Sequence, residues 1–166
     1  GGNYFGRKLR DRRFDGLVQR SINEGKPLSE ANIDRITGYY TTRLERLRAE
    51  TITRTELLGS LHAAQNAALQ QMVDAGYVDA DDIELEWDSA EDTFTRASHR
   101  AANKQRRKHG QLFKIGESFL AFPGDPDGPA EEIINCRCFL RARVDFLKGI
   151  KKRLTEKELF EVRALM

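Results

Sequence analysis

The spacing of hydrophobic residues in the first half of the chain predicts helices. Within residues 4–23 they recur every three or four positions, at Phe14, Leu17, Val18 and Ile22. Gly25 and Pro27 break this pattern, and Ser29 is a suitable N-cap for a second helix. The apolar positions of that helix are Ile33, Ile36, Tyr40, Leu44 and Leu47, and a similar row continues through Leu58, Leu61, Ala68 and Met72. We therefore expect a long or gently bent helix that stops at Gly76 in the left-handed conformation.

The hydrophobic period changes to two in the second half of the chain. Ile83, Leu85 and Trp87 alternate with acidic residues, which predicts a half-buried strand. Residues 89–103 fit a helix slightly better than a strand because of their alanines. Further strand candidates are residues 111–115, 118–122 and 133–144, and residues 122–129 have the composition of a loop. Thr155 and Glu158 form a capping box that predicts a C-terminal helix.

These elements predict an α+β fold, in which long N-terminal helices pack on a small, mainly antiparallel β-rich C-terminal half followed by a short C-terminal helix. A length of 166 residues suits one domain with a helical extension. We divide the chain into an N-terminal helical extension (1–27), a main domain (28–145) and a C-terminal helical tail (146–166).

Composition narrows the classes of protein that the chain can belong to. Hydrophobic residues make up 39% and charged residues 33%, enough for a core beneath a charged surface. No apolar run approaches the roughly 18 residues that a membrane span needs, and no signal-like segment is present. The two cysteines are too few and too close for a disulfide framework, so reduced thiols in a cytosolic setting fit better.

The charges are segregated along the chain although the net charge is only +2. Residues 74–92 contain nine acidic residues and no lysine or arginine, whereas residues 96–114 contain seven basic residues and no acid. A solvated or intramolecularly paired basic segment is the favoured interpretation. The alternative is salt-dependent contact with DNA phosphates through Arg100, Lys104, Arg106, Arg107 and Lys108.

Cys136 and Cys138 are candidate metal ligands. On a strand, residues two apart point to the same face, so both thiols could reach one ion, for which zinc is the candidate. His99 and His109 could complete the site, with His109 or Asp92 as the fourth ligand. The alternative is that the cysteines are small core residues beside hydrogen-bonded histidines. His62 lies in the helical row and is expected to be a structural or surface residue.

An enzyme is a minority interpretation. His99, His109, Asn103 and Asn135 superficially resemble the residues of a His-Asn-His nuclease, but their spacing fits no such pattern. No glycine-rich phosphate loop is present in the sequence. We expect no catalysis, and keep a metal-dependent DNA-binding or nuclease module as the alternative function.

Four short motifs follow one another over residues 28–144. They are Arg48–Glu56 (RAETITRTE), Trp87 with Asp92–His99, Gly110-Gln111 with Glu117–Phe119, and Phe122–Pro126 leading to Ile134–Cys138. In order and spacing they resemble the phage Mu F-like head-morphogenesis family. The main domain of residues 28–145 is thus expected to be a Mu F-like domain.

This resemblance implies a minor capsid protein that associates with the portal protein and the major capsid protein during head assembly. Its expected place is the host cytoplasm during assembly, and then the capsid interior or portal vertex of the virion. The resemblance also links the chain to DNA packaging or ejection, with double-stranded DNA as a further partner, and brings no established catalytic activity, small-molecule substrate or membrane. Some relatives carry a cysteine pair where this chain has Arg96 and His99, a pattern that suits zinc. Arg96 is not a ligand, and is instead expected to pair with Asp92.

The motifs also predict a structural polar network. Arg54 and Glu56 are charged residues beside an apolar row, and if buried they need partners. Asp92, Arg96 and His99, near Trp87, are the candidates, and such a network would fasten the helical half to the β half. The alternative is that Arg54 and Glu56 face water.

Overall fold

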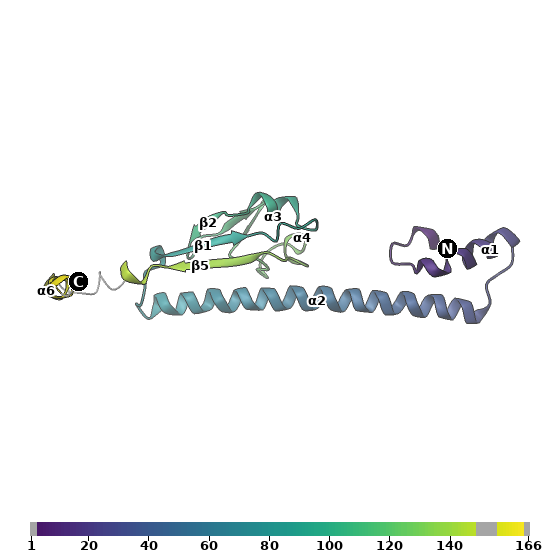
Figure 1. The fold of residues 1–166 in the computed structure, drawn as a ribbon, viewed down its shortest axis with the longest axis horizontal. Helices are drawn as coiled ribbons and strands as arrows, with labels where there is room; N and C mark the ends of the chain where they lie inside the picture. The colour runs from purple at the N-terminus through teal and green to yellow at the C-terminus, as the bar shows by residue number, and fades with distance from the viewer. Residues whose placement is uncertain (1–2, 149–155, 165–166) are drawn as a thin grey trace. The chain divides into compact units, whose positions relative to one another are not determined.

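The computed structural model describes residues 3–148 and 156–164 of the chain. The chain divides into two compact units, residues 1–51 and residues 52–166, and each is described by itself. The long helix α2 (Glu30–Asp74) belongs to both (Figure 1). None of the helices in the described ranges is long and apolar enough to cross a membrane.

The N-terminal unit opens with short helical turns, so the helix predicted over residues 4–23 is wrong in its first half. The elements are the 3₁₀ helices η1 (Tyr4–Gly6) and η2 (Arg12–Phe14), followed by the α-helix α1 (Asp15–Glu24). The side chains of Asn3 and Asp11 accept hydrogen bonds from backbone N–H groups two residues ahead. Such local bonds compete with a continuous helix.

Helix α2 is one continuous α-helix that begins directly after Ser29. It ends where the sequence predicts, with Gly76 in the left-handed conformation (φ +70°). The N–H of Gly76 donates to the carbonyl of Val73 at 2.9 Å, and the N–H of Tyr77 donates to that of Met72 at 3.0 Å. These two bonds are the Schellman arrangement that closes helix C-termini.

The C-terminal unit is built on two small antiparallel sheets. The first has the order β2-β1-β5, and the second pairs β3 with β4. The strands are β1 (Ile83–Asp88), β2 (Arg106–Lys108), β3 (Phe113–Ile115), β4 (Ser118–Leu120) and β5 (Phe139–Val144). The short helices are η3 (Ala80–Asp82), α3 (Ala97–Ala101), α4 (Ala130–Ile133) and α6 (Glu156–Ala164). The α+β fold class is therefore confirmed.

Three expectations about the strands need correction. The strand predicted over residues 133–144 begins only at Phe139, because α4 and a turn occupy the preceding residues. Asn135 in that turn has φ +61°, which a strand cannot contain. Strands β3 and β4 are shorter than the predicted segments, and β2 was not predicted as a strand.

Thr155 of the expected capping box lies outside the described residues.

The segregated charges meet across the first sheet. The acids of β1 stand between basic residues of its two neighbours: Glu84 is opposite Lys108 and Arg143, and Glu86 is opposite Arg106 and Arg141. Arg106 Nε lies 2.9 Å from Glu86 Oε2, and Arg141 Nη2 lies 2.6 Å from Asp88 Oδ2. Cross-strand pairs of opposite charge stabilise a sheet. The acidic run thus supplies the central strand and the basic run one edge.

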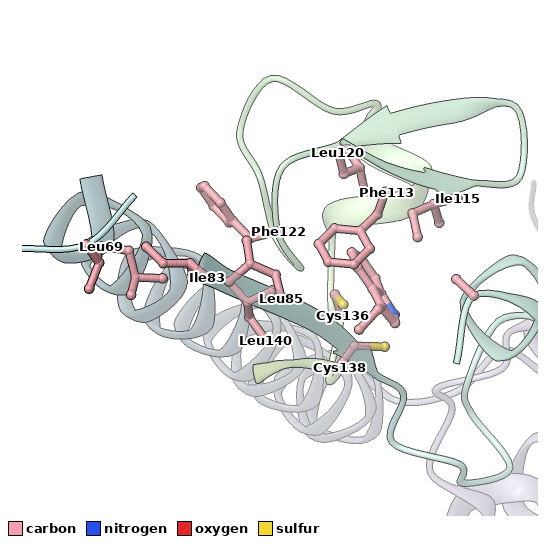
Figure 2. Packing of buried hydrophobic residues seen from close by; sticks show 13 residues of the cluster. Leu69, Ile83, Leu85, Phe113, Ile115, Leu120, Phe122, Cys136, Cys138 and Leu140 are labelled. Atoms are coloured by element: carbon pink, nitrogen blue, oxygen red, sulfur yellow. The ribbon is translucent and has the colours of Figure 1, made fainter. Parts of the chain in front are cut away.

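The apolar face of this sheet forms the core of the C-terminal unit. Ile83, Leu85 and Trp87 of β1 are at most 1% exposed, which matches their predicted alternation. Side chains from β3, β4 and the following loop pack with them, among them Phe113, Leu120 and Phe122 (Figure 2). The core also takes in both cysteines and, from α2, Leu69.

Helix α2 approaches the loop after β4 closely at Gly59. A Cβ atom built on Gly59 would lie 3.0 Å from the carbonyl oxygen of Gly124. Gly124 itself has φ +81°, a conformation that side chains rarely adopt. The two glycines therefore let the backbones of helix and loop meet, and the prolines on either side of Gly124 limit how far the loop can yield.

We expect Gly59→Ala to lower the melting temperature, whereas Gly38→Ala raises it. Both positions lie inside α2, where alanine is favoured over glycine by about 0.5–1 kcal/mol. A Cβ at Gly38 meets nothing within 4 Å, so only the favourable effect remains there. At Gly59 the contact with the loop opposes it at a cost of about 1–3 kcal/mol. Thermal unfolding followed by circular dichroism measures both, and equal stabilisation by the two changes would contradict the close approach.

Candidate functional site

Three residues with metal-ligand chemistry meet inside the C-terminal unit. His99, Cys136 and Cys138 are 2%, 4% and 2% exposed, and one ligand atom from each lies within 4.8 Å of the other two. His99 Nδ1 is 3.3 Å from the sulfur of Cys138 and 3.6 Å from that of Cys136. Both cysteines are free, and Figure 2 shows their sulfur atoms among the core side chains. We call these three residues the Cys2His cluster.

The local backbone explains how the cluster forms. His99 lies on α3, and the cysteines lie on the segment between α4 and β5. This segment is not the predicted strand. It follows the turn at Asn135, yet Cys136 and Cys138 still bring their sulfur atoms to the same point. The sequence predicted that both thiols would approach His99 from a strand. In the structure they do so from a segment without regular secondary structure.

The orientation of the His99 ring is fixed from its other side. Its Nε2 lies 2.9 Å from Oε2 of Glu132, which also accepts a hydrogen bond from the Ser98 hydroxyl at 2.9 Å. The Trp87 ring meets the imidazole edge-on, with centroids 5.5 Å apart. A carboxylate only accepts hydrogen bonds, so Nε2 carries a proton and Nδ1 faces the sulfur atoms.

The two thiols differ in acidity because a hydrogen bond links them. A hydrogen bond from Cys136 lowers the pKa of Cys138 to about 5, and a hydrogen bond to His99 acts in the same direction. The same contact, together with burial, raises the pKa of Cys136. Cys138 is therefore the thiol that ionises first.

Polar contacts fasten the cysteine segment to α2. The Arg54 guanidinium donates to Oδ1 of Asn135, and the backbone N–H of Asn135 donates to the Thr55 hydroxyl at 2.8 Å. Asparagine tolerates the left-handed conformation that this turn requires. Asn135 directly precedes Cys136, so this contact also positions the cluster.

His62 supplies a second contact between α2 and the same region. It is 2% exposed, and its Nδ1 lies 2.7 Å from the carbonyl oxygen of Pro123. The backbone N–H of Leu140 donates to its Nε2 at 3.4 Å. Burial lowers the pKa of His62, so the ring is held neutral between a donor and an acceptor. Of the two expectations for His62, the structural one holds. We call the contacts of Arg54, Thr55 and His62 with this region the α2 joint.

The partners in the predicted polar network differ from those expected, because Arg54 donates to Asn135 and not to Asp92 or His99. Arg54 and Trp87 reach the cluster region as described, whereas Glu56 is exposed. The expected pair between Asp92 and Arg96 is wrong, because Asp92 does not lie on α3 and pairs with Arg137 at 2.9 Å. Arg96 donates to the carbonyl of Ile134 at 2.5 Å instead.

The other predicted site residues lie away from the cluster. His109 has its Nε2 3.0 Å from Oε1 of Gln70, so neither it nor Asp92 is placed as a fourth ligand. The five candidate DNA-contacting residues all make contacts within the chain: Arg100 with the Thr95 carbonyl, Lys104 with Asp88, Arg106 with Glu86, Arg107 with the Leu112 carbonyl and Lys108 with the Asp81 carbonyl. Their contact with DNA stays a prediction.

Comparison with known protein families shows to which family the chain belongs. The model of the phage Mu protein F like family matches residues 12–141. The chain belongs to this family. Membership indicates a phage head-morphogenesis or minor capsid protein, active in virion assembly. Neither the curated proteins nor the solved structures compared with the chain gave a significant match.

In this Mu F-like chain the first, second and last of the four sequence motifs meet at the Cys2His cluster. The RAETITRTE stretch carries Arg54 and Thr55, and the last motif carries Asn135 and both cysteines. The residues that sequence reasoning missed are Glu132, Ser98, Thr55 and Arg137. No motif marked Glu132, which lies between the predicted loop (122–129) and the predicted strand (133–144).

The pH dependence of stability tests the role of His62. In the unfolded chain His62 takes up a proton when the pH falls below its ordinary pKa of 6.5. In the folded chain burial lowers the pKa of His62, so the ring stays neutral to lower pH. Stability should therefore fall as the pH drops below about 6.5 and recover above it. His62→Gln removes this titration, so the free energy of unfolding should depend less steeply on pH between about 7 and 5. Denaturant titrations at each pH measure the slopes, and equal slopes would contradict a neutral buried His62.

Proposed function

We propose that the chain is a minor capsid protein that associates with the portal vertex through α2. In this proposal it contacts the portal protein and the neighbouring major capsid protein during head assembly, and remains in the capsid interior or at the portal vertex. From that place it aids DNA packaging or ejection. Membership of the phage Mu protein F like family supports the setting, and the exposed surface of α2 supports the mode of binding.

The observation that carries the proposal is an apolar row on α2 within the C-terminal unit. Leu57 and Leu61 are 66% and 56% exposed, and the exposed alanines Ala64 and Ala68 continue the row. Their spacing of four, three and four residues is the spacing at which helices pack against partner helices. At about 100° per residue, the centre of the row lies roughly 120° around α2 from His62 and Leu69, which face the core.

Exposed leucines at this spacing favour a protein partner. Burying each one stabilises a complex by about 1.5–3 kcal/mol, and a row on a straight helix suits another helix or an apolar groove. The basic residues favour DNA less, because their contacts already lie within the chain. The alternative of a metal-dependent nuclease gains no support, since His109 bonds to Gln70 and stands outside the Cys2His cluster.

We expect the double variant Leu57→Glu/Leu61→Glu to lose portal binding. Each charge would be buried in the interface, so the affinity should fall about tenfold or more. The chain is co-expressed with the portal and major capsid proteins of its phage, and the amount that co-purifies with portal rings and heads is measured. Both leucines are exposed, so the melting temperature should stay at the wild-type value.

Ile52→Glu is the matched control. Ile52 is also an exposed apolar residue of α2, 49% exposed, but lies roughly 140–180° around the helix from the two leucines. It should leave co-purification unchanged. Wild-type protein that binds neither portal nor heads, or a double variant that binds as well as the wild type, would overturn the proposal.

A further inference from the structure

The Cys2His cluster has the dimensions of a metal site. In tetrahedral zinc coordination, with bonds of about 2.3 Å to sulfur and 2.0–2.1 Å to nitrogen, a nitrogen and a sulfur ligand lie about 3.6 Å apart. The distances from His99 Nδ1 to the two sulfur atoms are 3.6 and 3.3 Å. Both nitrogen–sulfur distances thus lie within a few tenths of an ångström of those in a zinc site, and the three ligand atoms all lie within 4.8 Å of one another.

The surroundings of His99 provide a second and independent argument. Histidines that bind metals usually donate their other ring N–H to a carboxylate, which fixes the ring and strengthens the ligand nitrogen. Here Nε2 of His99 lies 2.9 Å from the acceptor Oε2 of Glu132, and the Ser98 hydroxyl donates to the same carboxylate oxygen. Because Nε2 is engaged by this carboxylate, Nδ1 is the ring nitrogen that faces the two sulfur atoms.

The position of the cluster gives a bound ion a structural task. It would link α3 to the segment between α4 and β5, which the chain connects through 36 intervening residues of loops and short elements. The C-terminal unit has a small core, and small units gain much from a metal cross-link. All three ligands are buried, so bulk solvent would have little access to the ion.

We propose that His99, Cys136 and Cys138 bind one Zn²⁺ ion, with Glu132 as the residue that positions His99. The chain supplies three ligands at this point, and a water molecule completes the tetrahedron. The ion takes the place of the thiol protons, so binding releases up to two protons as both sulfur atoms become thiolates. This site is independent of how the chain docks in the phage head.

The first test measures binding directly. The wild-type chain is purified without chelators, and its zinc content is measured by elemental analysis; about one equivalent per chain is expected. Removal of zinc and addition of Co²⁺ should produce thiolate-to-cobalt charge-transfer absorption, which excess Zn²⁺ then abolishes. Cys138→Ser should lose the zinc and the absorption. Because serine is nearly isosteric, circular dichroism of this variant shows whether its fold is kept.

Two further variants separate a designed site from adventitious binding. Glu132→Gln keeps all three ligands but loses the carboxylate, so zinc should still bind in one equivalent with affinity lowered about 10- to 100-fold. His109→Asn is the matched control and should change neither stoichiometry nor affinity. A chelator should lower the melting temperature of the wild type and leave that of Cys138→Ser unchanged.

Three results would overturn the proposal. The first is wild-type protein that holds less than about a tenth of an equivalent of zinc and gives no cobalt charge-transfer absorption, since structural sites retain their metal. The second is a Cys136–Cys138 disulfide, seen by mass spectrometry as the loss of two hydrogens, in protein that binds no metal under reducing conditions either. The third is binding that survives Cys138→Ser, which would place the ion elsewhere.

Discussion

The attachment of α2 to the segment before β5 is the interaction on which the C-terminal unit depends. His62 and Leu69 are the buried side chains of helix α2, and Ala63, Met72 and Val73 are partly buried against the core. Directed polar contacts of the α2 joint add to this packing and fix the position of the helix. Asn135 is the shared element, because the residue that meets α2 also turns the chain so that Cys136 can enter the core.

Polar contacts also help to hold the first sheet together. The edge strand β2 consists of three basic residues, and acids of β1 lie opposite two of them, Arg106 and Lys108. The segregated charges therefore stabilise strand pairing and leave the apolar face of β1 free to form the core.

Much of the fold follows from periodicity, whereas the site follows only in part. The continuous apolar row and Gly76 predicted α2 and its end, and the alternation in residues 83–88 predicted β1. Strand β2 was not predicted because it has no apolar alternation and is instead stabilised by ion pairs with the acids of β1. The sequence grouped His99 with the two cysteines, and the structure brings these three residues together. It could not reveal Glu132 or exclude His109, since those depend on how α4 and α2 pack, which no local pattern records.

A double-mutant cycle across the α2 joint tests the central claim most directly. Arg54→Ala removes the guanidinium, and Asn135→Gly removes the amide while it keeps the left-handed backbone accessible. From denaturant unfolding of the wild type, both single variants and the double variant, we expect a coupling energy of about 1 kcal/mol or more, as for a hydrogen bond to a charged group. Additive effects, with a coupling below about 0.3 kcal/mol, would show that this contact does not seat α2 and would contradict the account.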